Sequence, residues 1–380
     1  MKKNKIIDFV VLGGGCAALS FINKVIDKKI KNFSFVIIEK RKKYYDDKSW
    51  CFWTEDKKQY DKILEKSWRS FSFNFKDKNN ILTSNSFEYI YIRSISFYNF
   101  VISKISSKPF IELKLNEDVI NIKFHKSYYQ ITTSRAVYLA KNVLDTRPNI
   151  DNFKKNPFMY QSFLGYEIKF KKQIDFNINN VYLMHNMKAD NKKFFFDYIL
   201  PINKNTVLFE HTIFSKNAFS EASIKKMLTR RLKIFNNNEF KVIRKEYGKI
   251  PMGIINKKAL IDKNNYFFTG TLAGAIRPSS GYGFLNIQSW ADQTTNKLKE
   301  EGKINSYFNN KVIEKYLDNL FLKIISNNSI YAPYIFYYFT KNIITETFIR
   351  FMIGNASFFD FIKVIYAMPK RVFIRCLIKN

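Results

Sequence analysis

The chain has 380 residues, of which 46% are hydrophobic, so it is too long for one compact core and too apolar to be mainly disordered. Lysine and arginine number 64 against 32 aspartate and glutamate residues, which gives a formal net charge of +32. No nucleic-acid recognition motif occurs, so this field predicts a membrane surface with anionic lipid, and no nucleic acid, among the partners. The alternative is a merely solubilising or compositional origin of the charge.

The cysteines and histidines exclude several kinds of site. Cys16, Cys51 and Cys376 form no C-x-x-C pair and are odd in number, which favours a reducing, cytoplasmic compartment. The three histidines are scattered singly, so no metal site is expected. The basic N-terminus leads into a glycine turn, and no uncharged apolar run reaches about 18 residues, so neither a signal peptide nor a transmembrane helix is expected.

The stretch from residue 5 to 40 predicts a strand, a glycine turn, a helix and a second strand. Ile6 to Leu12 is an apolar run that leads directly into glycines. Gly13, Gly15 and Ala18 match G-x-G-x-x-G/A, in which the first glycine turns the chain, the second admits a pyrophosphate, and the small third residue lets helix pack on strand. The N-terminus of a helix that starts near residue 16 would face the phosphates.

An acid follows the second predicted strand. Phe33 to Ile38 is that strand, and Glu39 stands at its end, where a carboxylate can accept hydrogen bonds from the ribose hydroxyls. Together these features predict a dinucleotide site, and its position near the start of a long chain favours FAD in a discontinuous domain. The alternative is a glycine turn without a ligand and a solvated Glu39.

The next hundred residues change character. Residues 40–53 are basic, then acidic, then aromatic without a clear period, which predicts a loop whose Trp50 and Trp53 line a cavity or cover the nucleotide domain. Residues 60–130 contain short alternating segments typical of antiparallel strands. Arg93 begins an amphipathic helix and either reaches the cofactor region or is a plain cation at a helix start.

Three acids lie where burial is expected. Asp145 follows the apolar run of a strand predicted at 142–148, at the sheet edge where open α/β folds bind ligands. Glu210 and Glu167 lie in strand-like segments between residues 160 and 214. A carboxyl in an apolar strand must be paired or keep its proton, which makes Glu210 the first general-acid candidate and Glu167 the second. The alternative is that both acids face solvent on the wet side of a strand.

A second glycine-rich stretch follows a short strand predicted at 266–270. The sequence TLAGAIRPSSGYGF then opens a helix from about residue 285 to 299. Gly281 and Gly283 lie just ahead of that helix, where bare backbone amides can approach an anionic or ring edge. The alternative is an ordinary loop with glycines at a helix start.

The remainder of the chain predicts helices with aromatic faces. From residue 305 apolar patches alternate with lysines, and apolar residues between 358 and 368 recur at near-helical spacing beside Lys363, Lys370 and Arg371. A helix with an apolar face and a basic rim either lies in a bilayer interface or packs against its own domain.

Eight landmarks in this order resemble the bacterial FAD-dependent lycopene cyclases. They span residues 8 to about 298, and beyond that only length and character match. The landmarks are GGGCAAL, DDKSWCFW, VLDTRP, YQSFLGYEI, FDYILPI, VLFEHT, YGKIPMG and GTLAGAIRPSSGYGF.

The resemblance implies an α/β, glutathione-reductase-like FAD-binding flavoprotein fold, with an inserted antiparallel β substrate domain and a helical C-terminal region. The expected divisions are a discontinuous FAD-binding domain at 1–75, 90–155 and 255–300, a mainly β substrate domain at 156–254 with residues 76–92 as a candidate addition, and a helical, aromatic and basic region at 301–380.

The resemblance also implies a reaction. The expected enzyme is a lycopene β-cyclase that binds reduced FAD, uses NAD(P)H as reductant, and converts lycopene or a related acyclic carotenoid to β-ionone rings without net redox change. An acid protonates the end-group alkene, a neighbouring double bond attacks the cation, and a ring proton is lost. Because such a polyene lives in membrane, the expected location is cytoplasmic and peripheral to the inner face of the cell membrane.

The resemblance assigns roles residue by residue. Glu210 occupies the first acid of the family's FLEET-like segment and becomes the expected proton donor, whereas His211 departs from the family's second acid. Glu167 would orient that acid or accept the final proton. The expected cofactor contacts are Gly13, Gly15, Ala18, Glu39, Arg93, Asp145, Gly270, Gly281, Tyr282 and Gly283, with Ala273 as a weaker guess.

Two other readings stay open. One is an FAD-dependent monooxygenase, halogenase or isoprenoid reductase that acts on a large hydrophobic substrate. The other is a basic flavoprotein that binds a lipid at the membrane without chemistry.

Overall fold

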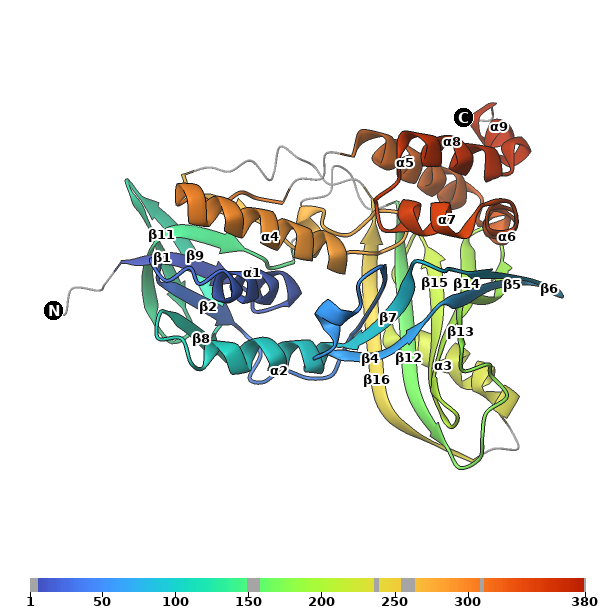
Figure 1. Ribbon diagram of the computed structural model, residues 1–380, viewed down its shortest axis with the longest axis horizontal. Coiled ribbons are helices and arrows are strands. Elements are labelled where there is room, and N and C mark those ends of the chain that lie inside the picture. The colour runs from blue at the N-terminus through green and yellow to red at the C-terminus, as the bar shows by residue number, and fades with distance from the viewer. Residues whose placement is uncertain (1–5, 149–157, 236–238, 254–263, 308–310, 379–380) are drawn as a thin grey trace.

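The computed structural model describes residues 6–148, 158–235, 239–253, 264–307 and 311–378. These residues form a mixture of α and β structure with three sheets. In Figure 1 a mainly parallel sheet with its helices lies on the left, and a long antiparallel sheet under a layer of helices lies on the right.

The first sheet carries the strand, turn, helix and strand that the sequence predicts. Its main path is β8 (Ile111–Leu115), β2 (Phe35–Glu39), β1 (Ile7–Leu12), β11 (Val137–Asp145), β10 (Tyr128–Thr133) and β9 (Val119–His125), and β17 (Tyr266–Phe268) also pairs with β11. β1 runs parallel to both of its neighbours, with Leu12 opposite Ile38 and Asp145. The C-terminal ends of β2, β1 and β11 therefore share one edge, at a point where the connections leave in opposite directions.

The two faces of this sheet are covered differently. Phe9 and Val11 of β1 pack on one face in a core that includes residues of three helices, α1 (Cys16–Asp27), α2 (Ser94–Ile105) and α4 (Phe284–Glu301). Val10 and Leu12 face the other way and pack with residues of β10 and β11. Both faces of β1 are buried, which explains why its sequence is continuously apolar.

The second sheet builds the antiparallel half of the molecule. Its order is β16 (Phe240–Met252), β12 (Met159–Phe170), β15 (Thr206–Ser215), β14 (Lys193–Asn203), β13 (Asn180–Ala189), β5 (Ser70–Phe75) and β6 (Lys78–Thr83). β5 runs parallel to β13, and the other neighbours are antiparallel. Every residue of the inner strand β15 is buried. A carboxyl on that strand cannot be solvated in the ordinary way.

The prediction of a loop through residues 40–53 is wrong for its last part. Ser49–Thr54 forms β3, which pairs with β7 (Glu88–Arg93), and β4 (Leu64–Trp68) completes this three-stranded sheet. Phe52 packs in the core beside α1 and α4, whereas Trp53 packs in the core of the second sheet. Because both faces of β3 are buried, its sequence lacks the alternation by which a strand is recognised.

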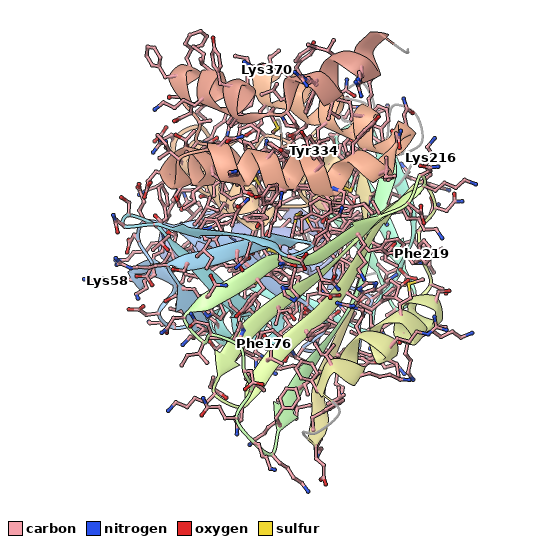
Figure 2. The ribbon with its side chains drawn as sticks, turned by 90° about the vertical axis from the view of Figure 1, so that its right-hand side faces the viewer. Lys58, Phe176, Lys216, Phe219, Tyr334 and Lys370 are labelled. Carbon is pink, nitrogen blue, oxygen red and sulfur yellow. The ribbon has the colours of Figure 1, made fainter. Side chains whose placement is uncertain are left out.

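Helices cover the two faces of the second sheet. α3 (Glu221–Arg231) packs on β12 and β15 on one side. On the other side lie α5 (Val312–Asn327), α6 (Ala332–Asn342), α7 (Thr345–Met352), α8 (Phe358–Ala367) and α9 (Lys370–Ile378). Figure 2 looks at this end of the molecule, with Tyr334 and Lys370 on the helical layer and Phe176 lower down at the sheet. Short 3-10 turns occur at Lys58–Tyr60, Leu232–Phe235, Thr271–Ala273 and Ser329–Tyr331.

A buried arginine ties the glycine-rich stretch before α4 to the helical layer. Arg277 is 4% exposed, its Nη2 donates to Asp318 of α5 at 2.9 Å, and its Nη1 donates to the carbonyl of Phe351 in α7. A buried cation of this kind is tolerated because a carboxylate and a carbonyl satisfy it. Among the described residues, none of the helices combines the length and apolar character needed to cross a bilayer.

Candidate functional site

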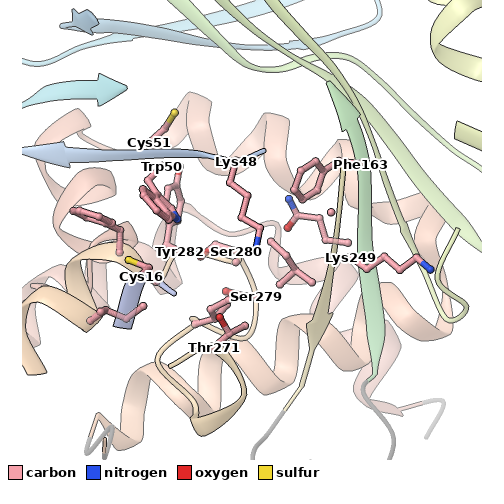
Figure 3. Close-up of a pocket in the computed structure, with 18 of the residues that line it drawn as sticks. Cys16, Lys48, Trp50, Cys51, Phe163, Lys249, Thr271, Ser279, Ser280 and Tyr282 are labelled. Atoms are coloured by element: carbon pink, nitrogen blue, oxygen red, sulfur yellow. The ribbon is translucent and has the colours of Figure 1, made fainter. Parts of the chain in front are cut away.

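One cavity of about 1430 Å³ runs between the two halves of the molecule. It begins at the glycine turn after β1, passes β3 and the glycine-rich stretch before α4, and ends among the side chains of α5 to α9. In Figure 3, Lys48 extends into its middle, with Cys16 and Trp50 on one side and Phe163 on the other. Most of the described residues singled out from sequence line this one cavity.

The glycine turn has the geometry that the G-x-G pattern predicts. Gly13 has a φ of +86°, and a Cβ built there would lie 2.8 Å from the Thr146 hydroxyl, so only glycine fits without strain. A Cβ on Gly15 would meet nothing within 4 Å, because it would point into open space. α1 starts at Cys16 with neither a side-chain cap nor an acid in its first turn. Its first amides are therefore free of a capping side chain at the cavity wall.

Glu39 lines the cavity, but protein groups already hold its carboxylate. Its Oε2 accepts from the Gly14 amide at 2.7 Å and from Arg41 Nη2 at 3.1 Å, and its Oε1 accepts from the Arg41 amide. Burial opposes ionisation of Glu39, yet the hydrogen bonds from Arg41 and Gly14 outweigh it and hold the pKa below its usual value. The acid is thus an anion that braces the turn and has lone pairs left for a ligand.

The opposite wall of this end comes from the C-terminal end of β11. Asp145 is buried and accepts two side-chain hydrogen bonds from Arg147, at 3.0 and 2.7 Å, and one from the Tyr266 hydroxyl at 2.6 Å. Gly270 follows β17 with a φ of +95°, and a Cβ there would lie 3.3 Å from the Thr146 carbonyl oxygen. Asp145, Arg147, Thr146 and Gly270 all line the cavity.

The stretch before α4 reaches the middle of the cavity. Gly281 has a φ of +76°, and a Cβ there would lie 3.1 Å from Gln161 Oε1. A Cβ on Gly283, which precedes α4, would lie 2.9 Å from Ile276 Cγ1. The left-handed backbone therefore favours glycine at 281, a close contact favours it at 283, and both residues line the cavity.

Aromatic side chains surround the cavity beside Tyr282. The hydroxyl of Tyr89 hydrogen-bonds to those of Tyr198 and Tyr282, at 2.9 and 3.3 Å. The ring of Trp53 lies 4.6 Å from that of Tyr89 and 5.5 Å from that of Tyr282, measured between centroids. Burial raises the pKa of the Cys51 thiol, so this cysteine is an uncharged member of the same wall. The faces of these rings can attract a cation in a dry site.

Glu210 projects into this aromatic part of the cavity from β15. It is 7% exposed, and its Oε1 accepts a hydrogen bond from the Thr212 hydroxyl at 2.7 Å. Burial raises the pKa of Glu210 to about 8, and the charge of neighbouring Glu246 adds to the shift. A carboxylic acid that keeps its proton at neutral pH in an apolar cavity has the property that a general acid needs.

Glu246 was not selected from the sequence. Glu210 on β15 and Glu246 on β16 both stand opposite Gly165 on β12, one on each side. Glu246 is 4% exposed, lines the cavity, and accepts from Ser49 at 2.6 Å and from Arg244 Nη1 at 2.9 Å. The only sequence signal was strand alternation, because Arg244 and Glu246 are charged residues two apart in a segment of β length.

Glu167 lies on the same sheet face but is not among the residues that line the cavity. Its Oε2 accepts from Arg244 Nε at 2.8 Å and from the Tyr91 hydroxyl at 3.4 Å. Arg244 in turn reaches Glu246, so Glu167 connects to the acid pair through this arginine. Its predicted part in the reaction stays a prediction.

His211 points away from the cavity. Alternation along β15 places it on the sheet face opposite Glu210, where its Nδ1 hydrogen-bonds to buried Asp197 at 2.8 Å and Arg231 Nε donates to the same carboxylate at 2.9 Å. His211, which stands where the family has its second acid, therefore does not contact the cavity around Glu210.

Two more predicted contacts lie outside the cavity lining. Arg93 precedes α2 and donates from its Nε to Asp46 at 2.7 Å. Ala18 is fully buried in the core between α1 and the sheet, which fits its predicted packing role. The structure otherwise brings together Gly13, Gly15, Glu39, Asp145, Gly270, Ala273, Gly281, Tyr282, Gly283 and Glu210.

Solved structures with the same fold include several enzymes at low sequence identity. A geranylgeranyl bacteriochlorophyll reductase-like protein from Thermoplasma acidophilum is 12% identical, with a TM-score of 0.67 and 98% of each chain covered. The p-nitrophenol 4-monooxygenase from Pseudomonas putida is 13% identical, with a TM-score of 0.58 and coverage of 98% of this chain and 97% of that one. The anhydrotetracycline hydroxylase from Streptomyces rimosus is 10% identical, with a TM-score of 0.60 and coverage of 92% and 75%.

A family model gives the more specific result. No curated protein matches the chain. The model described as lycopene cyclase protein matches residues 8–327, which include the glycine turn, the acid pair and the glycine-rich stretch before α4. The chain belongs to the lycopene cyclase family.

Proposed function

We propose that this protein is a lycopene β-cyclase, which converts the ends of lycopene, or of a related acyclic carotenoid, into β-ionone rings without net redox change. The observation that carries the proposal is Glu210, a protonated acid in an aromatic cavity that is continuous with a dinucleotide-type glycine turn. The family membership supports the substrate class.

The residues around Glu210 suit an acid-initiated reaction. Glu210 donates its proton to the end-group alkene, and the rings of Trp53, Tyr89 and Tyr282 face the cation that results. The wall is mostly apolar and aromatic, so it excludes water that would trap the cation before the neighbouring double bond attacks. Loss of a ring proton to a carboxylate completes the cycle.

The other end of the cavity fits FAD. Gly13 and Gly15 leave the backbone bare beside the uncapped start of α1, which suits a pyrophosphate, and Glu39 has lone pairs left for a ribose. The buried Oγ1 of Thr269 and Oε1 of Gln161, both in the cavity wall, have no partner among the described residues. When bound and reduced by NAD(P)H, FAD would supply negative charge near the cation.

The protein is proposed to act at the surface of the cell membrane, on its cytoplasmic face. Phe358, Phe359 and Tyr366 of α8 are 67%, 72% and 70% exposed. Ile365 and Lys370 beside them line the cavity, so its helical end opens next to this apolar face. An exposed apolar face with lysines at its rim suits an anionic bilayer that holds the polyene.

Vesicle sedimentation tests the membrane proposal. Replacement of Phe358 and Phe359 by serine is expected to lower binding to vesicles of phosphatidylglycerol and phosphatidylcholine at least fivefold. The control is replacement by serine of Ile120 on β9, which is 68% exposed at the other end of the molecule. This replacement should leave vesicle binding unchanged. Equal loss in both variants, or no binding by the native protein, would contradict it.

Expression in a lycopene-accumulating bacterial strain tests the reaction. The native protein should yield cyclised pigment, and Glu210→Ala should leave lycopene unchanged while the purified variant stays folded and binds flavin. Unchanged lycopene with folded, flavin-loaded native protein would reject the cyclase proposal.

The second candidate is an FAD-dependent monooxygenase or isoprenoid reductase acting on a large hydrophobic substrate. The likeness to a reductase-like protein and to a monooxygenase over nearly the whole chain favours it. It requires consumption of NAD(P)H, or of oxygen as well, in proportion to product, whereas the cyclase consumes neither of them in proportion to product.

A further inference from the structure

Four residues form a row across the second sheet. Tyr198 on β14, Glu210 on β15, Gly165 on β12 and Glu246 on β16 are direct partners from strand to strand. Side chains at directly paired positions lie on the same face of a sheet, so the two acids face the cavity on either side of a glycine. Tyr198, Glu210 and Glu246 all line that cavity.

Gly165 provides the room that the two acids share. A Cβ at this position would lie 3.1 Å from Glu246 Cγ, 3.3 Å from Glu246 Oε1 and 3.3 Å from Glu210 Cβ. Any larger residue would therefore push the two side chains apart. Glu246 thus folds over this empty position, and the Cβ of Glu210 borders it.

The two acids have different hydrogen-bond partners, and this difference indicates which of them carries the negative charge. Arg244 and Ser49 both donate to Glu246 Oε2, and buried Arg244 is itself held by Glu167 and the Tyr91 hydroxyl. For Glu210 the donor found among the described residues is the neutral Thr212 hydroxyl. A negative charge is better stabilised on the acid next to the arginine.

Other titratable groups face this pair from every neighbouring element. They are Arg244 on β16, Glu167 on β12, Tyr198 on β14, Cys51 on β3, Tyr91 on β7 and Asp46 in the segment before β3. Burial raises the pKa values of Tyr198, Tyr91 and Cys51, so these three stay neutral. Arg244 is the one buried cation among the six.

We propose that Glu210 and Glu246 share a single proton, with Glu246 as the positioning residue that stays ionised on Arg244 and keeps the proton on Glu210. Burial raises the pKa of Glu246 too, but Arg244 and Ser49 oppose that shift. Two like charges in one dry cavity cannot both form readily, so ionised Glu246 raises the pKa of Glu210 and keeps this acid protonated at neutral pH, where its proton is available to an alkene.

The proton balance closes without another reactant. The role in the reaction rests on the proposed cyclisation, whereas the shared proton is a property of the protein alone. In the first step the O–H bond of Glu210 breaks as a C–H bond forms on the substrate. In the last step a ring C–H bond breaks, its electrons form the ring double bond, and the proton returns to a carboxylate of the pair. The pair begins and ends each cycle with one proton.

Infrared titration of the purified protein tests the shared proton without any substrate. The carbonyl band of a protonated, buried carboxyl should disappear near pH 8 in the native protein and be absent from Glu210→Gln. In Glu246→Gln the band should stay but titrate at least about one pH unit lower, because the neighbouring anion is gone. Glu314→Gln removes another buried acid, whose pKa burial raises, and should leave the Glu210 titration unchanged.

Glu246→Asp covers the case in which Glu246→Gln fails to fold. It keeps the negative charge, so the Glu210 band should titrate within about half a pH unit of the native value. An unchanged titration in folded Glu246→Gln, or an equal shift in both variants, would overturn the proposal.

Activity against pH tests the positioning role. Loss of activity as Glu210 ionises should occur near pH 8 in the native protein and about one pH unit lower in Glu246→Gln, so turnover at pH 8 falls about fivefold while turnover at pH 6 changes little. Glu246→Asp keeps the negative charge, so its turnover at pH 8 should stay close to that of the native protein. If the infrared result holds and no cyclised product forms at any pH, the shared proton stands and the cyclase proposal fails.

Discussion

The two ends of the cavity are built in opposite ways. At the first sheet, bare backbone and a helix start form the site, and Gly13, Gly15 and Glu39 come from one short stretch of chain. At the second sheet, Glu210 and Glu246 come from separate strands and depend on a buried arginine. A ligand phosphate can be held by local structure, whereas an acid with an unusual pKa needs a dry environment made by many segments.

The largest expected effect breaks the charge network at the second sheet. Arg244→Met removes a buried cation that holds Glu167 and Glu246, so the free energy of unfolding should fall by about 3–5 kcal/mol, measured by urea denaturation. Arg93→Met is the control, because Arg93 is the more exposed member of its pair with Asp46, at 32%, and the expected loss is about 1 kcal/mol or less. Equal losses would show that Arg244 does not organise the network.

The next prediction compares substitutions of two glycines at the first sheet. Gly13→Ala forces a left-handed backbone and a Cβ against Thr146, so it should cost about 1–3 kcal/mol of stability and abolish flavin retention. Gly15→Ala adds a methyl group in open space, so stability should change by less than about 0.5 kcal/mol while flavin affinity still falls. Denaturation and flavin fluorescence of the purified variants measure both. Tight flavin binding by Gly13→Ala would contradict the assignment.

A smaller effect concerns stability against pH. The pKa of Glu210 is raised from an ordinary 4.5 to about 8 in the folded protein, so the folded state holds a proton that the unfolded state releases. The contribution of Glu210 to stability is therefore present below pH 4.5 and is lost as pH rises through 8. Glu210→Gln cannot ionise, so it should be more stable than the native protein at pH 9 and similar at pH 5. Thermal unfolding at the two pH values measures the difference, and a variant that is less stable at pH 9 would speak against a raised pKa.

The smallest effect on activity is expected from His211. This side chain lies on the far face of the sheet from Glu210, so His211→Asn should change turnover by less than about twofold while lowering stability through the loss of its bond to Asp197. Pigment analysis measures the effect on turnover, and denaturation measures the effect on stability. A large loss of turnover in a folded variant would place His211 in the reaction.

Some residues of the candidate site can be singled out from the sequence, and others cannot. Glu210 was identified because a carboxylate inside an apolar strand has few alternatives to protonation. Glu246 lies among Arg244, Lys245 and Lys249, and that local sequence resembles a solvated strand. β3 was predicted as a loop because burial of both faces removes the alternating pattern.

The sequence by itself determined the glycine turn, the strand that leads into it and the acid at the end of β2, because these depend on backbone conformation and contacts within about forty residues. Only the tertiary structure decided that Glu246 shares Gly165 with Glu210, that Glu167 lies behind Arg244, and that His211 faces away. The physical reason is that strand register sets which side chains meet, and burial by segments far apart in the chain sets their charge.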